Sequence, residues 1–379
     1  MATSSPTFPA QPSLRLRFLL NALLAGFAVA ATLLAFELGV RWFGEIDALR
    51  PIEVFNVDLS TRRAFLPGSE RVYETKEFRY TLHANRFGRR DREWTDAEMA
   101  DPRNVLFVGD SFVMGASVED EHTIPTQLEA WTASRGERRE VFNFGMAATG
   151  IPQYVQMLGD ALNEGIQART VLLGIFVGND FDPSTLEPVA SGSATPSPAP
   201  IARYTLHSHL IEFLRLRISN STRLTGLLLH LDEWFGVRLY NTANSYIFLR
   251  NPPPDKEQAF VRILGSVGDF QEICRQHQRE LYVVIFPNRI QVENRESLSS
   301  SVYDAERPDR RILEYCEQHG LRCLDGLPGL SEAYARERRP LYYAVDRHLN
   351  ESGTRVVTAL IADWLERTRA LGEDGSAPR

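Results

Sequence analysis

Residues 104–115 read NVLFVGDSFVMG, and this stretch determines the fold that we expect for the chain. After Asn104 the run is apolar as far as Val108, which is typical of a strand buried on both faces. Gly109-Asp110-Ser111 follows directly, and these are residue types of tight turns and helix N-caps. The stretch therefore predicts a buried strand that ends in a turn carrying a serine.

The same pattern returns along the chain, where short apolar runs alternate with segments of helical character. Strands are expected at 104–108, 140–144, 170–177, 281–286 and 321–324. Helices are expected at 124–134, 152–168, 256–279, 308–319 and 351–368. Strands that are apolar on both faces and separated by helices predict a parallel sheet covered on both sides. We therefore expect an α/β domain over residues 104–370.

Residues that can carry chemistry stand where these strands end. Ser111 follows the first strand, Gly145 ends the second and Asn179 follows the third. Asp346 and His348 come just before the last helix. In an open α/β sheet, ligands bind at the carboxyl ends of the strands. Each residue alone would be ordinary turn or surface composition, but their coincidence at one edge predicts a single site.

Nucleophilic catalysis requires this set of groups. His348 can take the proton of the Ser111 hydroxyl, and Asp346 can orient the imidazole and stabilise its charged form. The backbone N–H groups of Ser111 and Gly145 and the side-chain amide of Asn179 can form an oxyanion hole, in which one lost donor costs on the order of 10²–10³ in rate. The sequence predicts a serine nucleophile at Ser111, and it implies no metal and no cofactor.

The four blocks resemble those of the SGNH (GDSL-like) hydrolase superfamily, which is named for its Ser, Gly, Asn and His. They correspond to Ser111 in VGDSFVMG, Gly145 in NFGMAATG, Asn179 in VGND and His348 in VDRHLNESG. The resemblance covers about residues 104–368. It implies a flavodoxin-like three-layer α/β/α fold and activity on esters or acyl groups. The G-x-S-x-G motif of α/β-hydrolases is absent.

One departure concerns the acid-base pair. Secreted esterases of the family separate Asp and His by two residues, whereas only Arg347 lies between Asp346 and His348. This D-x-H spacing resembles that of alginate O-acetylation proteins and related polysaccharide acyltransferases. Three functions stay open. The first is an esterase that removes acyl groups, of which acetyl is the expected one, from an envelope or extracellular carbohydrate. The second is a polysaccharide O-acyltransferase, and the third is a non-catalytic glycan-binding or assembly protein. The intact set of site residues argues against the third.

The N-terminal region predicts a membrane anchor. Residues 18–36 carry no charge, and as a helix they would reach the roughly 30 Å of a bilayer core. Ala28-Val29-Ala30 resembles a signal-peptide cleavage site, but the apolar run continues past it. We therefore expect an uncleaved single-pass anchor at 18–43. The usual arrangement of such anchors places residues 1–17 in the cytoplasm and the catalytic domain in the periplasm or outside the cell.

Three further regions are expected around the α/β domain. Residues 44–103 alternate in a way that predicts a short strand-rich linking region, and residues 371–379 form a flexible tail. Residues 181–255 form an insertion, with an exposed Pro/Ser/Ala-rich loop at 187–200 and helical segments at 205–235. Such an insertion either covers the substrate site or packs on the side of the domain.

The net charge bears on the possible binding partners, and the cysteine content bears on possible disulfides. The formal net charge of -7 and the absence of a long Lys/Arg run argue against a nucleic-acid partner. Cys274, Cys316 and Cys323 contain no C-x-x-C pair and are interpreted as packed apolar residues. A disulfide between Cys316 and Cys323 stays open for an oxidising compartment.

Overall fold

The computed structural model divides the chain into two compact units. One comprises residues 1–46 and 202–217, and the other residues 47–201 and 218–379. The structure describes residues 14–43, 65–75, 77–186, 210, 213–214, 245–344 and 346–372. Almost all of the 187–200 loop and the 205–235 helices expected within the insertion lies outside the described residues.

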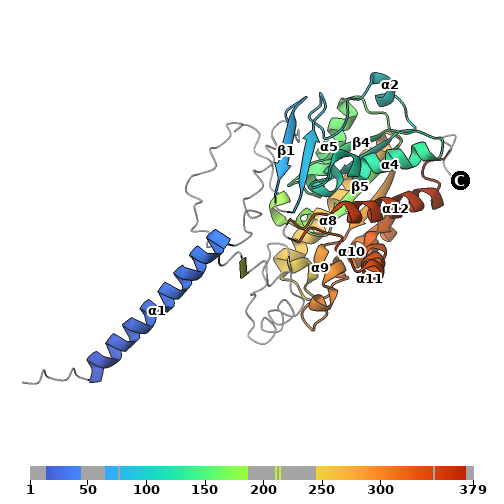
Figure 1. The fold of residues 1–379 in the computed structure, drawn as a ribbon. Helices are drawn as coiled ribbons and strands as arrows, with labels where there is room; N and C mark the ends of the chain where they lie inside the picture. Colours follow the sequence, from blue (N-terminus) through green and yellow to red (C-terminus); the bar gives the residue numbers. More distant parts are fainter. Residues whose placement is uncertain are drawn as a thin grey trace, which may run out of the picture. The chain divides into compact units, whose positions relative to one another are not determined.

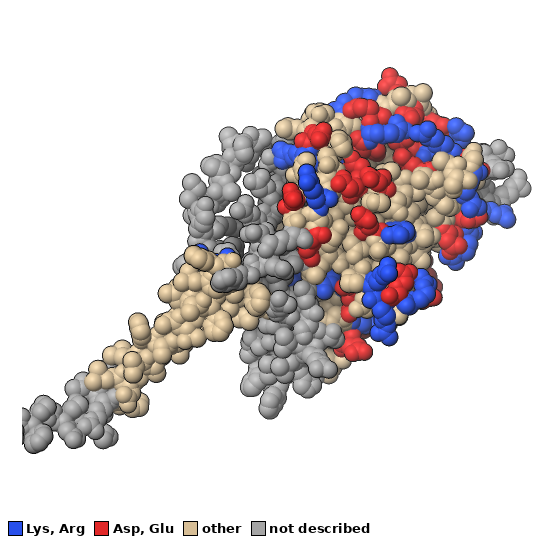
Figure 2. All heavy atoms as spheres, viewed as in Figure 1, with Lys and Arg blue, Asp and Glu red and all other residues tan. Residues whose placement is uncertain are grey.

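The first unit contains one long helix, α1 (Leu14–Phe43). Its segment Leu20–Trp42 has a mean hydropathy of 2.1 and is long and apolar enough to cross a membrane. The large apolar side chains along it are exposed, with Phe27 at 73% and Trp42 at 83%. Figure 2 shows this helix almost free of charge, whereas acidic and basic residues are interspersed over the visible face of the other unit. The expected apolar helix is confirmed.

The second unit is built on a five-stranded parallel sheet with the order β4-β3-β5-β6-β7 (Figure 1). The strands are β3 (Val105–Gly109), β4 (Val141–Gly145), β5 (Thr170–Phe176), β6 (Glu280–Phe286) and β7 (Arg322–Asp325). Numbered within the sheet, this order is 2-1-3-4-5, the flavodoxin-like arrangement, in which the strand order reverses beside the first strand while all strands stay parallel. The predicted fold class is confirmed.

Helices cover both faces of the sheet. One layer contains α5 (Ile151–Asn163), α8 (Pro254–Gln276) and α10 (Arg307–Gln318), and the other contains α4 (Ile124–Ser134), α11 (Gly326–Glu337) and α12 (Glu351–Arg367). Successive strand residues enter opposite cores, as Phe107 and Val108 do in β3. The sheet is therefore the middle of three layers. Helix α11 was not expected from the sequence.

The region before the sheet packs into the domain core. β1 (Glu70–Glu74) and β2 (Arg79–His83) form an antiparallel hairpin, and the short helix α2 (Asp96–Met99) follows. Trp94 is fully buried, with its ring centroid 5.1 Å from that of Phe142 in β4. This segment, expected as a linking region, therefore shares a core with the sheet and contributes to the site described below.

Short elements complete the described part of the chain. They are α3 (Ser111–Met114), η2 (Asp120–His122), η3 (Asn179–Phe181), η4 (Pro183–Leu186), η6 (Ser245–Phe248), α9 (Arg289–Glu293) and η7 (Arg295–Leu298). A disulfide joins Cys316 at the end of α10 to Cys323 in β7, with a Cα–Cα distance of 6.3 Å. The interpretation of these two cysteines as packed thiols is thereby corrected, whereas Cys274 is a buried free thiol.

Candidate active site

Ser111 lies on a tight turn between β3 and α3. The Asp110 side chain accepts a hydrogen bond from the backbone N–H of Phe112 at 2.8 Å and so caps α3. Gly115 ends this short helix at a φ of 85°, a left-handed conformation that favours glycine. Ser111 is 7% exposed. The turn therefore holds the hydroxyl at the carboxyl edge of the sheet, close to the surface.

Gly145 lies against this turn, at a position where no side chain would fit. In the β3–β4 ladder Gly145 pairs with Gly109, so β4 ends level with the residue two before the serine. A Cβ at position 145 would lie 2.0 Å from the backbone nitrogen of Met114. The close approach of α3 to β4 thus requires glycine, and it fixes the nucleophile turn through backbone packing.

His348 and Asp346 extend from Ser111 in a continuous chain of hydrogen bonds. Nε2 of His348 lies 2.7 Å from Oγ of Ser111, and Nδ1 of His348 lies 2.6 Å from Oδ1 of Asp346. The side chains of His348 and Asp346 are 19% and 8% exposed. The structure therefore brings together the three residues expected to act as nucleophile, base and orienting acid, although their catalytic roles stay predictions.

Burial and charge oppose each other at the histidine. Burial lowers the pKa of His348, but the carboxylate of Asp346, its hydrogen bond and the more distant carboxylate of Asp110 outweigh this effect and raise the pKa above its usual value. Burial raises the pKa of Asp346, whereas His348 and the hydrogen bonds to it lower the pKa, with a net lowering. The pair therefore favours an ionised aspartate and stabilises an imidazolium.

The D-x-H spacing is accommodated by one left-handed residue. Arg347 has a φ of 71°, and its N–H donates to the carbonyl of Tyr343 at 3.2 Å. The N–H of Tyr343 in turn donates to the carbonyl of His348 at 2.9 Å. With one residue between them, Asp346 and His348 meet because the chain reverses at Arg347.

The three predicted oxyanion donors differ in their present partners. The N–H of Ser111 has no hydrogen-bond partner among the described residues. The N–H of Gly145 donates to Oδ1 of Asn143 at 3.0 Å, so it would have to exchange this partner to serve an oxyanion. Nδ2 of Asn179 donates to the carbonyl of Thr149 at 3.2 Å, which uses one of its two hydrogens. Their roles at an oxyanion stay predictions.

Three residues that the sequence did not single out support Asp346. Ser117, which is 2% exposed and has a φ of 72°, donates its hydroxyl to Oδ1 of Asp346 at 2.7 Å. The N–H of Asp346 donates to Oε2 of Glu77 at 2.9 Å. Arg90, also buried, donates to the carbonyls of Gly115 and Val118, which flank Ser117 in the chain. No local sequence signal marks these contacts, because their partners are remote along the chain.

Two further aspartates near the site have other uses. Asp180, next to Asn179, is fully buried and accepts hydrogen bonds from Tyr154 Oη at 2.6 Å and from the N–H of Phe176 at 2.8 Å. It therefore shapes the turn that carries Asn179. Burial raises the pKa of Asp110 to about 6, and hydrogen bonding and His348 oppose this shift. Asp110 is thus a second acidic group beside Ser111, and it also caps α3.

Among the described residues, one group of carboxylates could hold a metal ion. Oxygens of Asp91, Glu129 and Glu140 lie within 4.8 Å of one another. Burial, together with the neighbouring carboxylates, raises the pKa of Asp91 to about 7, of Glu129 to about 7 and of Glu140 to about 8. Asp91 and Glu129 accept backbone N–H groups of β4, and Arg92 donates to Glu140. These bonds give the carboxylates a structural role, because two of them accept backbone N–H groups of the edge strand β4.

No family model and no curated protein sequence matches the chain. Solved structures similar to it include a member of the lipolytic protein G-D-S-L family from Veillonella parvula DSM 2008, at 11% identity, 70% coverage of this chain, 98% of that chain and a TM-score of 0.40. An acetyl xylan esterase, AlAXEase, has 13% identity, coverages of 69% and 99%, and a TM-score of 0.40. The corresponding values for TesA are 10%, 70%, 98% and 0.39. These sequence identities and TM-scores are too low to support an assignment of function, which rests on the geometry of the site.

Proposed function

We propose that the protein is a serine esterase that removes acyl groups, with acetyl as the expected group, from an envelope or extracellular carbohydrate. The observation that carries this proposal is the relay from Ser111 Oγ to His348 Nε2 at 2.7 Å and from His348 Nδ1 to Asp346 at 2.6 Å. A serine hydroxyl becomes a useful nucleophile only when a positioned base takes its proton. The resemblance of the four sequence blocks implies activity on esters or acyl groups. The choice of acetyl and of an envelope carbohydrate rests on the D-x-H spacing, which resembles that of polysaccharide O-acetylation proteins, and on the expected membrane anchor.

In the first step, Oγ of Ser111 attacks the ester carbonyl carbon while its proton passes to Nε2 of His348. The carbonyl π electrons move to oxygen, and the N–H of Ser111 and the second amide hydrogen of Asn179 would donate to this oxyanion. When the intermediate collapses, the bond to the sugar oxygen breaks, and that oxygen takes the proton from His348. The products are a free sugar hydroxyl and an acyl-serine.

In the second step, water attacks the acyl-serine and gives a proton to His348. Collapse of the second tetrahedral intermediate breaks the bond to Oγ, which recovers the proton. The carboxylic acid leaves. Asp346 stays ionised throughout, which agrees with the lowered pKa of its carboxyl group.

An O-acyltransferase is the second candidate, and the D-x-H spacing favours it. The turn at Arg347 gives the pair a closer spacing than that of the secreted esterases. In a transferase, a sugar hydroxyl replaces water in the second step, and every protein group keeps its role. The two candidates differ only in the acceptor that reaches the acyl-serine.

We further propose a location on the outer side of a membrane. Helix α1 would serve as a single-pass anchor, with residues 1–17 in the cytoplasm. The Cys316–Cys323 disulfide supports a periplasmic or extracellular domain, because disulfides persist in oxidising compartments. A cysteine-accessibility assay on intact cells, with a single cysteine placed before or after α1, would test this orientation.

Covalent trapping provides the direct test of the nucleophile. The full-length protein in detergent is treated with an organophosphonate, and the labelled peptide is located by mass spectrometry. We expect label on Ser111, and label on another residue would contradict the proposal.

Replacing the nucleophile provides the matching kinetic test. Ser111→Ala should lower kcat/KM for a small acetyl ester by at least about 10⁴-fold, because no base can activate an absent hydroxyl. The circular dichroism spectrum should not change. Ser134→Ala, at an exposed serine of α4, is the matched control and should keep full activity. Undiminished turnover by Ser111→Ala would refute the assignment.

Acceptor choice is measured on acetylated and unacetylated glycan. Acetate release that is independent of added acceptor supports the esterase. Transfer of acetyl to a glycan in excess of hydrolysis supports the acyltransferase. Both reactions should disappear in Ser111→Ala.

A further inference from the structure

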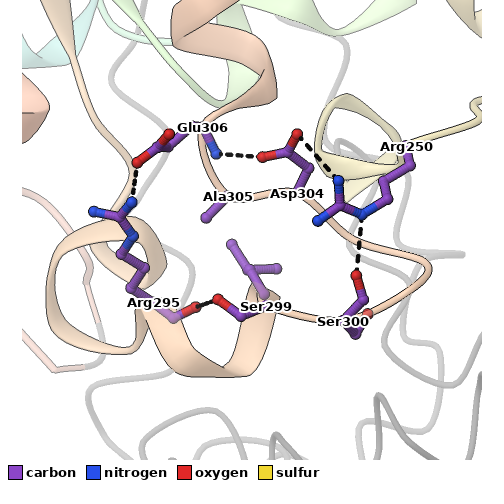
Figure 3. A pocket seen from close by; sticks show the side chains of 8 residues that line it. Arg250, Arg295, Ser299, Ser300, Asp304, Ala305 and Glu306 are labelled. Carbon is purple, nitrogen blue, oxygen red and sulfur yellow. Dashed lines mark hydrogen bonds and ion pairs between the residues drawn. The ribbon is translucent and has the colours of Figure 1, made fainter.

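Two arginine-lined pockets differ in their balance of charge. The first, of about 370 Å³, contains Arg250, Arg295, Asp304 and Glu306 (Figure 3). Each arginine faces an acid there: Arg295 is bonded to Glu306, and Arg250 lies 3.6 Å from Asp304. This pocket offers a ligand little unbalanced charge.

The second pocket, of about 520 Å³, is strongly basic. Arg169, Arg275, Arg279 and Arg322 line it together with a single acid, Glu280. The lining therefore has an excess of arginines, although the chain as a whole has a net charge of -7. Its volume lies within the range of small-molecule sites.

Carboxylates only partly neutralise these arginines. Glu280 is shared by two of them, at 3.2 Å from Arg169 and 3.5 Å from Arg322. Arg275 is paired on its own helix with Glu272 at 2.7 Å. Four guanidinium groups thus face two carboxylates, so two positive charges are left without an acid.

Arg279 carries one of these charges in a fixed position. Its guanidinium donates to the carbonyls of Ala168, at 2.6 Å, and Ile166, which are neutral partners. Burial lowers the pKa of Arg279, yet a guanidinium stays protonated in proteins. The result is a partly desolvated cation that its hydrogen bonds hold in place.

The pocket wall is held by the fold. Arg169 directly precedes β5, Glu280 begins β6 and Arg322 begins β7, so the pocket lies at the amino edge of the sheet. Arg322 belongs to the short loop closed by the Cys316–Cys323 disulfide. Since Ser111 stands at the carboxyl edge, the length of β5 separates the two places by about 20 Å.

From this arrangement we infer a second binding site, for a phosphate or sulfate oxyanion that is either free or carried by a small molecule, in the pocket formed by Arg169, Arg279 and Arg322. Guanidinium groups match such oxyanions through paired N–H donors. Oxyanion binding would balance the two unpaired charges, and it would not depend on catalysis at Ser111.

Calorimetric titration of the full-length protein with inorganic phosphate tests this site. The titration is done at constant ionic strength with chloride as the background anion, because screening weakens non-specific attraction. We expect saturable one-to-one binding. Heat no larger than that with added chloride would overturn the proposal.

Two variants that change the pocket charge in opposite directions sharpen the test. Arg322→Gln removes a donor and should weaken phosphate binding about tenfold or more. Glu280→Gln removes the competing acid and should tighten it. Arg367→Gln, at an exposed ion pair on α12, is the control and should leave the affinity for phosphate unchanged. Equal weakening of phosphate binding by Arg322→Gln and Arg367→Gln would show attraction by net charge alone and would overturn the site.

The source of the oxyanion is separated by comparing three probes. Inorganic phosphate and glucose 1-phosphate should both bind, and glucose should not. Tighter binding of the ester would indicate a phosphorylated saccharide, and equal binding would indicate free phosphate. Binding of glucose alone would contradict an oxyanion site. Hydrolysis of a small acetyl ester should be unchanged in Arg322→Gln, so failure of this proposal is distinct from failure of the esterase proposal.

Discussion

The two halves of the candidate site are held in different ways. On the nucleophile half, Ser111 is fixed by backbone packing, because α3 lies so close to β4 that a Cβ on Gly145 would be 2.0 Å from Met114. On the acid-base half, Asp346 and His348 lie on the segment between α11 and α12, outside the sheet. Side chains from remote parts of the chain support that segment.

This difference predicts two kinds of sensitivity. The backbones of α3 and β4 are in close and rigid contact, so an added methyl group between them has to displace one of these main-chain segments. A hydrogen-bonded segment loses one partner at a time, and the charge of Asp346 is shared among His348 and Ser117. Damage to the nucleophile half should therefore reduce both stability and activity, whereas damage to the acid-base half should mainly reduce activity and change its pH dependence.

Among substitutions that separate the two halves, Asp346→Asn should have the largest effect. An amide cannot stabilise the imidazolium, and a comparable change in serine proteases costs about 10⁴-fold in kcat. Without this carboxylate, burial dominates and lowers the pKa of His348. The base stays neutral to lower pH, so the acid limb of the residual kcat/KM profile should move to lower pH.

In the unmodified protein, the same limb should lie above the ordinary histidine pKa of about 6.5, because the pKa of His348 is raised. Asp363→Asn, at an exposed pair on α12, is the control and should leave the profile unchanged. An unshifted acid limb in Asp346→Asn would mean that this carboxylate does not act on His348.

Gly145→Ala tests the nucleophile half. The new Cβ would overlap the backbone of α3, so the serine turn has to shift, and a displacement of about 1 Å can cost 10²-fold in rate. The free energy of unfolding should also fall by about 1–3 kcal/mol, as measured by denaturant titration. Gly159→Ala, where nothing lies within 4 Å of the added Cβ, should be neutral or slightly stabilising. Loss of activity with unchanged stability would show that packing does not fix this half.

The contrast also explains what the sequence could predict. The strands and the positions of Ser111, Gly145 and Asn179 follow from apolar runs and from the residues at their ends, which are local signals. The support of Asp346 is not local. Its bonds to Ser117 and Glu77 join residues 229 and 269 positions apart. Only the folded topology brings such residues together, so no periodicity or spacing marks them.

Helix α11 and the disulfide were hidden for different reasons. Gly326, Pro328 and Gly329 stand in the first turn of α11 and read as a loop, although proline is tolerated in a first turn and the Asp325 side chain caps the helix there. The Cys316–Cys323 bond depends on a Cα–Cα distance that composition does not contain.

Ser117→Ala tests the support of the acid-base half. The lost bond is charge-assisted and buried, and it fixes the carboxylate that orients His348, so kcat should fall about tenfold with little change in KM. Because Ser117 has a positive φ, alanine keeps the backbone strain of the serine, whereas Ser117→Gly removes both the hydroxyl and the strain. Equal loss of kcat in both variants assigns the effect to the hydrogen bond. If Ser117→Gly keeps full kcat, the hydroxyl does not support Asp346.

Arg347→Gly should have the smallest effect, and it tests whether the D-x-H turn stores strain. A left-handed φ of 71° costs a non-glycine residue about 1–2 kcal/mol, whereas glycine adopts it freely but gains entropy in the unfolded chain. These terms nearly cancel, so the free energy of unfolding should rise by at most about 1 kcal/mol and kcat/KM should change by less than about threefold. Arg338→Gly is the matched control, since Arg338 has a φ of 52° at the end of α11, remote from Ser111 in the chain. If both variants gain similar stability and only Arg347→Gly changes kcat, the left-handed residue helps to set the Asp346–His348 geometry. A large loss of stability in Arg347→Gly alone would show that the Arg347 side chain, and not its backbone conformation, holds the turn.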